Sequence, residues 1–192
     1  RGGSKPKTRV SLSQLIRNTL NFALFEFDEI KATINIDPKI YEVEGDQSKL
    51  RSMFEALIKN AAESVSSSKK SDGEIVIEIK NIEVFRDNEH SIQPGTYVQV
   101  SFKDNGPGLK RKEVNRIFDP YYSGEKKGRG LGLSGAAAVS RSHGGHISVN
   151  SHEGDGACFD VFLPALTSGP RLTEVESNSL RVLVLDDEPH IC

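Results

Sequence analysis

Residues 128–134 read GRGLGLS, and they lie a short way beyond residues 104–109, which read DNGPGL. Both stretches are rich in glycine, and a glycine lets the backbone approach a ligand closely because it has no Cβ. The DNGPGL stretch begins with a carboxylate, that of Asp104. Together with Asn60, an asparagine on an apolar helix in the run LIKNAAES, the two turns predict the walls of a nucleotide pocket.

The residues around these turns show helical and strand patterns. Apolar residues recur at helical spacing in three segments and with a two-residue period in five, and Asp46 is suited to cap the second helix. The elements are mixed without strict alternation, which favours a two-layer α/β sandwich, with a mixed sheet covered by helices on one face, over a doubly wound parallel sheet. The predicted helices cover residues 11–27, 46–65 and 131–142, and the predicted strands cover 32–36, 74–85, 96–103, 146–151 and 157–163.

The composition narrows the class of protein. Hydrophobic residues make up 36% of the 192-residue chain, and no apolar run reaches the roughly 18–20 residues that span a membrane. Lysine and arginine total 25 against 27 aspartates and glutamates, so the charge of −2 gives no support for a nucleic-acid-binding protein. The N-terminal RGGSKPKT lacks the pattern of a signal peptide, and Cys158 and Cys192 indicate neither a disulfide framework nor a zinc site. We therefore expect a cytoplasmic protein.

A change in composition predicts where the main domain ends. Residues 167–180 are polar, contain Gly-Pro and lack periodicity, as in a linker. The following RVLVL, residues 181–185, is a short apolar run of the kind found in buried parallel strands. The predicted divisions are an N-terminal linker over 1–9, a domain over 10–166, a second linker over 167–180, and the start of another domain over 181–192.

Asp104 follows a predicted strand and heads the first glycine turn. A carboxylate fixed at a strand end accepts a hydrogen bond from an exocyclic amine such as adenine N6, and Gly106 and Gly108 leave room for the flat base. Taken alone, the same residues fit a hairpin turn equally well, since Asp-Asn-Gly is common there. The second glycine stretch favours the nucleotide interpretation.

Gly128, Gly130 and Gly132 lie where a loop enters a predicted helix. Unpaired backbone N–H groups and the positive end of the helix dipole favour phosphate at such a place. Lys126, Lys127 and Arg129 would add positive charge opposite the phosphates, although a solvated cation on a surface loop is the alternative for each lysine. The spacing matches neither the GxxxxGK[ST] phosphate loop nor the strand-linked GxGxxG fingerprint, which argues against those folds.

Asn60 is a polar residue on a helix whose other face is apolar. The amide oxygen of asparagine is a suitable hard ligand for Mg²⁺, which binds few protein groups and completes its shell with phosphates and water. A surface asparagine is the ordinary alternative for a lone residue, and the neighbouring glycine turns favour the metal ligand.

Taken in order, these motifs resemble those of the ATP-binding domain of bacterial sensor histidine kinases. The resemblance covers residues 10–164, and it is specific because the motifs follow one another as they do in the family. LIKNAAES resembles the asparagine box, DNGPGL and GRGLGLS resemble two glycine boxes, RIFDPYYSG (116–124) resembles the phenylalanine-containing segment that leads into the ATP lid, and residues 143–164 resemble the closing strands with a last glycine box at Gly154 and Gly156.

The resemblance implies a Bergerat-type α/β sandwich that binds ATP and Mg²⁺. It implies that Asp104 reads adenine, that Asn60 is the catalytic Mg²⁺ ligand, and that the γ-phosphoryl group passes to a histidine on an upstream dimerisation domain of a homodimeric parent. The implied nucleotide site comprises Asn60, Asp104, Gly106, Gly108, Phe118, Lys127, Gly128, Arg129, Gly130, Leu131, Gly132 and Leu133.

The tail RVLVLDDEP, residues 181–189, resembles the start of a response-regulator receiver domain. By this likeness Asp186 and Asp187 would bind Mg²⁺ beside a phosphorylated aspartate further along the chain. The parent would then be a hybrid sensor kinase, either cytoplasmic or with this chain in the cytoplasmic part of a membrane-anchored sensor. An acidic helix N-terminus after a strand is the alternative interpretation.

Two departures from the family pattern keep other functions open. Many members carry a second asparagine one helical turn before the first, and Ala56 stands there, so a non-catalytic nucleotide-sensing or interaction module is the main alternative. None of the five histidines lies on a predicted dimerisation helix, and we expect the phosphoacceptor upstream. A related ATP hydrolase would need a glutamate one turn before Asn60, but Glu55 lies about 140° away around the helix.

Overall fold

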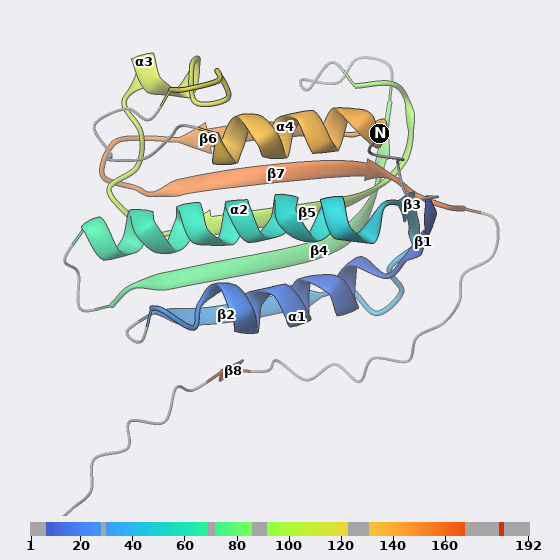
Figure 1. Ribbon diagram of the computed structural model, residues 1–192, viewed down its shortest axis with the longest axis horizontal. Helices are drawn as coiled ribbons and strands as arrows, with labels where there is room; N and C mark the ends of the chain where they lie inside the picture. The colour runs from blue at the N-terminus through green and yellow to red at the C-terminus, as the bar shows by residue number, and fades with distance from the viewer. Residues whose placement is uncertain are drawn as a thin grey trace, which may run out of the picture.

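The computed structural model describes residues 7–27, 30–68, 72–85, 92–122, 131–167 and 181–182. These residues form a mixed sheet with a layer of helices on one of its faces (Figure 1). The predicted two-layer α/β sandwich is confirmed. The strands are β1 (Thr8–Val10), β2 (Lys31–Ile36), β3 (Val43–Gly45), β4 (Glu74–Val84), β5 (Gly95–Asp104), β6 (His146–Ser151), β7 (Ala157–Pro164) and β8 (Arg181–Val182), and the helices are α1 (Leu12–Ala23), α2 (Gln47–Ser67), α3 (Arg111–Val114) and α4 (Gly132–Ser142).

The sheet order β6-β7-β5-β4-β2-β8 makes β5 a central strand. β5 pairs antiparallel with β4 on one side and with β7 on the other, so its last residue, Asp104, lies opposite Ile75 and Ala157. Its inward-facing residues, Val100 and Phe102 among them, are fully buried beneath the helices. A residue at the end of this strand is therefore held by hydrogen-bonded neighbours on both sides.

β2 and β4 are parallel neighbours, and the crossover between them contains α2. Parallel strands need such a long connection, and this one lays a 21-residue helix across the sheet. Asp46 is its N-cap, as the sequence predicts: Oδ1 accepts hydrogen bonds from the backbone N–H groups of Ser48 and Lys49. The cap fixes where the helix begins, and so fixes which residues of α2 reach the far end of β5.

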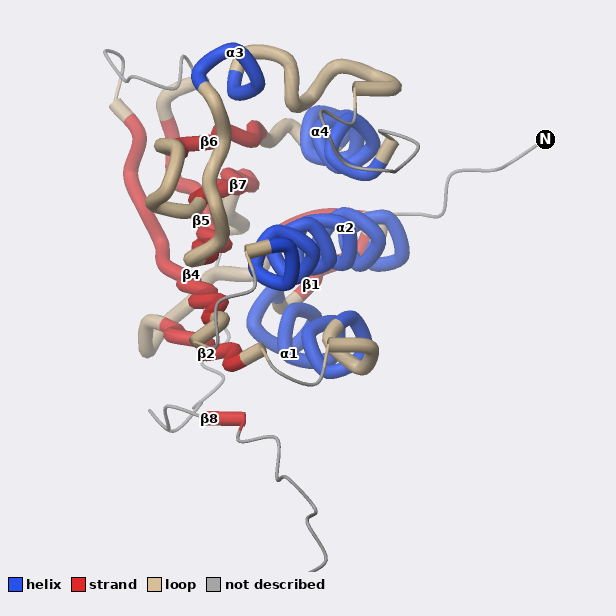
Figure 2. Tube along the Cα trace, turned by 90° about the vertical axis from the view of Figure 1, so that its left-hand side faces the viewer, coloured by secondary structure: helices blue, strands red, loops and turns tan. Residues whose placement is uncertain are grey.

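α2 brings one of the largest fully buried side chains, that of Phe54, to the sheet. Phe54 is fully buried, and its ring centroid lies 5.9 Å from that of Phe102 on β5. A fully buried side chain of this size contributes about 1.5–3 kcal/mol by removal from water. Figure 2 shows α1 and α4 on either side of α2, so that the three helices together cover one face of the sheet.

His143 ties the end of α4 to the start of α2. Its Nε2 accepts a hydrogen bond from the backbone N–H of Asp46 at 3.0 Å, and its Nδ1 lies 2.8 Å from the carbonyl oxygen of Val139. Because a backbone N–H can only donate, Nε2 must be unprotonated, and Nδ1 carries the proton that bonds to Val139. The buried, neutral imidazole thus joins two helices that flank the candidate site.

The structure also contains elements that the sequence pattern does not predict. β1, β3 and α3 are only three or four residues long, too short for a hydrophobic period to reveal them. α1 ends at Ala23 rather than at residue 27, because the chain turns there and Leu24 becomes the C-cap. No helix in the described parts of the chain combines the length and the apolar composition needed to cross a bilayer.

The tail differs from the predicted buried parallel strand over residues 181–185. Arg181–Val182 form β8, which pairs antiparallel with Ala32 and Thr33 of β2 at the edge of the sheet. The edge strand of a sheet has unpaired backbone N–H and C=O groups that can pair with an extended segment. A local sequence pattern does not show which edge strand such a segment will pair with. Residues 183–185 lie outside the described residues.

Candidate nucleotide site

Asp104 is a buried carboxylate at the end of the central strand, in a residue only 2% exposed. Its Oδ1 accepts two hydrogen bonds, from Ser64 Oγ of α2 at 3.1 Å and from the backbone N–H of Gly106 at 2.9 Å. Burial of a charge is costly unless the charge is hydrogen-bonded. These two donors therefore stabilise an ionised carboxylate at this position.

Gly106 has no room for a side chain. A Cβ built on it would overlap Ser64 Oγ and would lie 2.7 Å from Asp104 Oδ1. In the turn after β5, the backbone of Gly106 therefore packs directly against Ser64 of α2. Glycine at this position lets the backbone N–H reach the Asp104 carboxylate.

The first glycine turn is locked against the turn between β6 and β7. Gly108 has a φ of +71° and Gly156 a φ of +82°, both in the left-handed region that favours glycine. A Cβ on Gly108 would overlap the carbonyl oxygen of His152, and a Cβ on Gly156 would overlap that of Asp104. Each turn thus passes through the space that a side chain on the other would need.

Hydrogen bonds complete this lock. The backbone N–H of Gly154 donates to the carbonyl oxygen of Pro107 at 2.7 Å. Ser151 joins both turns, since its Oγ accepts from the backbone N–H of Leu109 at 2.9 Å and donates to the carbonyl oxygen of Gly156 at 2.7 Å. The loop that follows Asp104 is therefore held in place by a distant part of the chain.

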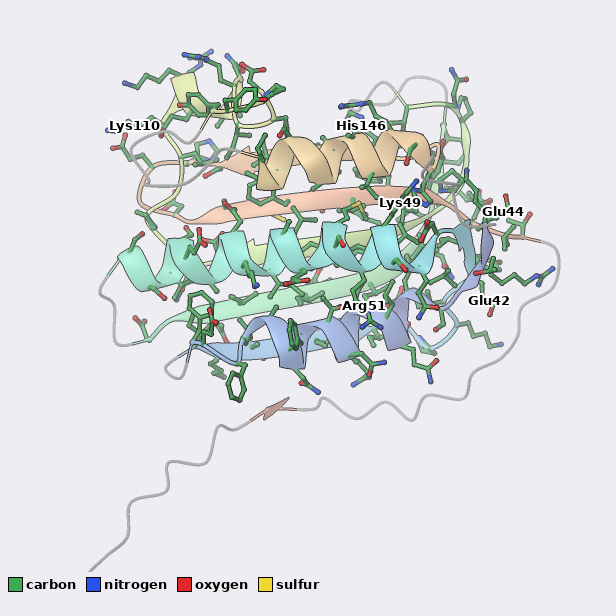
Figure 3. All side chains as sticks on the ribbon, in the orientation of Figure 1. Glu42, Glu44, Lys49, Arg51, Lys110 and His146 are labelled. Atoms are coloured by element: carbon green, nitrogen blue, oxygen red, sulfur yellow. The ribbon has the colours of Figure 1, made fainter. Side chains whose placement is uncertain are left out.

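The hairpin alternative for residues 104–109 is wrong. β5 pairs with β4 and β7, and the chain continues from the glycine turn into α3, whose N-cap Lys110 is labelled in Figure 3. Asn105 anchors the turn on the β4 side, where its side chain accepts from the backbone N–H of Glu74 at 2.9 Å and donates to the carbonyl oxygen of Asp72 at 2.7 Å. The Asp-Asn-Gly turn here connects β5 to α3 and does not join two antiparallel strands.

Ala56, Asn60 and Ser64 form one row along α2. Residues four apart share a face of a helix and lie about 6 Å apart along its axis. Ser64 bonds to Asp104 at one end of the row, and at the other end Ala56 Cβ would lie 4.0 Å from a Cβ built on Gly132. Asn60, which is half-buried, therefore lies between the Asp104 carboxylate and the start of α4.

α4 begins beside this row. Gly132 is its first residue, Leu131 is its N-cap and is 45% exposed, and Leu133 packs against the core. The first N–H groups of a helix have no partner within the helix, and together with the helix dipole they favour an anion. Four further predicted site residues lie outside the described residues: Lys127, Gly128, Arg129 and Gly130.

Phe118 fixes the segment that leads away from α3. Its ring meets that of Phe159 on β7 edge-on, with 6.3 Å between the centroids and 88° between the planes. Nearby, the guanidinium of Arg116 lies 4.8 Å from the centroid of the Tyr122 ring, in cation–π contact. The first contact holds the segment to the sheet, and the second lies within the segment, between Arg116 and Tyr122, the last described residue before Leu131.

Comparison with known proteins identifies this arrangement. Residues 45–167 match the family model described as histidine kinase-, DNA gyrase B-, and HSP90-like ATPase. The chain belongs to this family. Sporulation kinase A of Bacillus subtilis is 36% identical over 122 residues, which are 64% of this chain and 18% of that relative. The sensory histidine kinase/phosphatase NtrB of Rhizobium leguminosarum bv. phaseoli is 32% identical over 142 residues, 71% of this chain and 35% of that relative.

Solved structures of histidine kinases share the fold. The mycobacterial sensor histidine kinase MprB gives a TM-score of 0.67 at 22% identity, with 83% of this chain and 97% of that one covered. The catalytic domain of histidine kinase ThkA gives a TM-score of 0.64 at 25% identity, with the same coverage of the two chains. The described domain is thus a histidine-kinase-type ATP-binding domain, and it spans only a minor part of the two curated relatives.

The residues of this kinase domain fit ATP and Mg²⁺. Because Gly106 and Gly108 lack side chains, the loop after β5 packs against Ser64 and against the β6–β7 turn, and it is held beside a carboxylate fixed by hydrogen bonds. Asn60 offers one hard oxygen, and the described residues hold no group of three or more histidine, cysteine or acidic ligands, so a Mg²⁺ ion there would depend on phosphate oxygens. Asp186 and Asp187, the predicted receiver ligands, lie outside the described residues.

Glu55 forms an ion pair with Lys59 and lies outside the row of Ala56, Asn60 and Ser64. Its Oε1 lies 2.9 Å from Lys59 Nζ, and this hydrogen bond raises the pKa of Lys59. Ala56, which has no ionisable group, occupies the place in the row where a hydrolase of this family would need its glutamate. The arrangement therefore gives no support to the hydrolase reading.

Ser64 and Ser151 are the residues of the site that sequence reasoning missed. For Ser64 a signal was present: it lies one turn after Asn60, so the two polar residues share a row on the helix. For Ser151 no local signal exists, since its two partners are reached only when β6 lies beside the first glycine turn.

Proposed function

We propose that this domain binds Mg²⁺·ATP and donates the γ-phosphoryl group of ATP to a histidine on an upstream dimerisation domain. The observation that carries the proposal is the buried Asp104 carboxylate, held at the end of β5 by donors from α2 and from the glycine turn. Such an acceptor selects a ligand with a hydrogen-bond donor at the matching place. In ATP that donor is the exocyclic amine, N6 of adenine.

The phosphates would extend from the base toward α4. One end of the row on α2 lies beside Asp104 and the other beside Gly132. A nucleotide whose adenine binds at the Asp104 end would place its phosphates along the row. Asn60 would hold Mg²⁺ against the phosphates, and the first N–H groups of α4 would face their negative charge. Lys127 and Arg129, together with the glycines beside them, would close over the phosphates from the lid.

The transfer itself asks little covalent chemistry of the domain. A ring nitrogen of the acceptor histidine attacks Pγ, a P–N bond forms, and the bond from Pγ to the β–γ bridging oxygen breaks. ADP leaves with that electron pair, and the proton on the other ring nitrogen is released to solvent. Bound Mg²⁺ supplies charge neutralisation, while the residues of this domain contribute positioning and backbone N–H donors.

The remainder of the parent would complete a phosphorelay. The matched region makes up 18% of sporulation kinase A and 35% of NtrB, so those relatives have other parts as well. We place the acceptor histidine upstream, in a homodimeric parent, and a receiver domain from about residue 181, where Asp186 and Asp187 would bind Mg²⁺. The catalytic domain would span residues 10–166, with linkers at 1–9 and 167–180, and would act in the cytoplasm, where its substrate ATP is present.

A second candidate is a nucleotide-sensing module without transfer activity. Ala56 favours it, because the row on α2 then offers the metal one asparagine where many family members have two. Both candidates require Mg²⁺·ATP binding, and they differ only in whether a phosphohistidine is formed.

Calorimetric titration of this chain with ATP, with and without Mg²⁺, tests the shared requirement. We expect Mg²⁺-dependent binding in the micromolar range. Absence of binding by a folded chain would contradict both candidates. Addition of the upstream acceptor domain with radiolabelled ATP then separates them: acid-labile label on that domain supports the kinase, and binding without label supports the sensing module.

A further inference from the structure

We infer that Ser64 is a positioning residue that orients the Asp104 carboxylate and thereby sets the preference of the site for adenine. The inference deepens the proposed function and rests on it, because it names a determinant of base specificity at the same site. The sequence motifs assign no role to this serine.

The two hydrogen bonds to Oδ1 come from different elements. Ser64 Oγ reaches it from α2 at 3.1 Å, and the backbone N–H of Gly106 reaches it from the glycine turn at 2.9 Å. The terminal torsion of an aspartate is broad, so a single donor leaves the carboxylate free to rock. Two donors on one oxygen fix the plane of the carboxylate and therefore also the direction of the second oxygen.

Ser64 differs from two other serines of this helix, Ser52 and Ser67. Ser52 donates to the carbonyl oxygen of Ser48, and Ser67 donates to that of Ser64, both within the helix. Such backbone bonds are the usual outcome for a helical serine. The Ser64 hydroxyl, 7% exposed, donates instead to a carboxylate on another element, forty residues along the chain.

A fixed carboxylate discriminates between bases. Adenine presents an amine that donates to the second oxygen, whereas purine presents no donor at that place and guanine presents a carbonyl oxygen that repels it. Discrimination of this kind is strongest when the protein group cannot turn away to find another partner. Loss of the Ser64 hydroxyl would let the carboxylate rotate and would weaken the recognition of the amine.

The test compares ATP with purine riboside triphosphate, which lacks only the amine, in titrations of the full chain and its Ser64→Ala variant. We expect Ser64→Ala to weaken ATP binding about tenfold, the size of one hydrogen bond to a charged group, and to change binding of the purine analogue less than about twofold. Equal losses for both ligands would mean that Ser64 only maintains the shape of the site. No loss for either would remove the role altogether. Both outcomes overturn the inference.

Two further variants sharpen the test. Ser140→Ala removes a serine that is also buried and whose Oγ has no hydrogen-bond partner within the described ranges, so it should leave both affinities unchanged. Adding Ser64→Ala to Asp104→Asn should cause little further loss, since residues that act through one another are not additive. Fully additive losses would place the effect of Ser64 outside Asp104 and overturn the inference.

Failure of the proposed function gives a different result. A parent chain that binds ATP no better than purine riboside triphosphate would show that the amine is not read at Asp104, and both proposals would fall. A parent chain that prefers ATP, with a Ser64→Ala variant that keeps the same preference, would overturn the role of Ser64 alone.

Discussion

The two ends of the α2 row differ in how firmly the chain itself holds them. At the Asp104 end, a carboxylate 2% exposed is bonded to a helix and a turn, and that turn is locked to a second one. At the Gly132 end, Leu131 is 45% exposed, and among the described residues outside the helix itself the nearest atom to a Cβ built on Gly132 is Ala56 Cβ, at 4.0 Å. One end is held by contacts within the protein, and the other shows few such contacts in the part of the chain that the structure describes.

This difference indicates how the two parts of a nucleotide are recognised. Groups already held in their bound geometry lose little freedom on binding, so the Asp104 end supplies specificity at low entropic cost. At the phosphate end, by contrast, most of the contacts that hold the phosphates would come from the metal and from the residues that precede Leu131.

Asp104→Asn should have the largest effect. The amide keeps the shape of the side chain, but the two donors on Oδ1 favour its oxygen there and leave its NH₂ toward the adenine amine, where donor meets donor. We expect ATP affinity to fall about 100-fold, measured by calorimetry. GTP should lose less, because its base presents an acceptor at that place.

The control is Asp160→Asn on β7, whose carboxylate accepts from Gln99 Nε2 at 2.9 Å. Its ATP affinity should match that of the parent. Asp104→Asn with ATP affinity intact would mean that the rigid end of the row does not bind the base.

Gly156→Ala should break the lock between the two turns. At a φ of +82° the new Cβ is strained, and it would also overlap the carbonyl oxygen of Asp104. We expect the free energy of unfolding to fall by about 2–3 kcal/mol, measured by denaturant titration.

Gly154→Ala is the matched variant. Gly154 has a φ of +95° in the same turn, but a Cβ there meets no atom of the described residues within 4 Å. The free energy of unfolding of this variant should fall only by the cost of placing alanine at a positive φ, about 1 kcal/mol. Equal losses in the two variants would show that the contact with Asp104 contributes nothing.

Asn60→Ala should act on the other end of the row, through the metal. We expect the gain in ATP affinity on adding Mg²⁺ to fall about tenfold, while affinity in EDTA stays near that of the parent. Asn18→Ala, which removes an exposed asparagine from α1, is the control. An unchanged response to Mg²⁺ in Asn60→Ala would end the assignment of this residue to the metal.

Ala56→Asn should give the smallest effect and the opposite sign. A second amide oxygen on the row, beside Gly132, should raise Mg²⁺·ATP affinity by a few-fold, on the order of 0.5–1 kcal/mol. Ala56→Leu has the same branched arrangement of side-chain heavy atoms without the amide and should not show the gain. A gain in both variants would mean that filling the space, and not coordination, is what matters.

The sequence predicts the Asp104 end less completely than the motifs suggest. It identifies Asp104, Gly106 and Gly108, and it predicts the strand that ends there. It does not reveal that Ser64 bonds to the carboxylate or that Ser151 joins the two turns, since both contacts cross long stretches of chain. Likewise, the short strands β1 and β3 form from pairing between distant residues and leave no periodic trace.

The features that can be predicted from the sequence alone are local. The periods of apolar residues determined the three long helices and the main strands, the Asp46 cap determined where α2 begins, and the glycines marked where the backbone must come close to something. These follow from interactions within a few residues, which a linear pattern records.

Only the tertiary structure decided what the glycines come close to. The order of strands places β5 at the centre, the crossover lays α2 above its end, and Gly106 then meets Ser64 while Gly156 meets Asp104. Such contacts depend on packing and hydrogen bonds between elements far apart in the chain. The sequence can name the residues of this site, but the fold alone decides which of them touch.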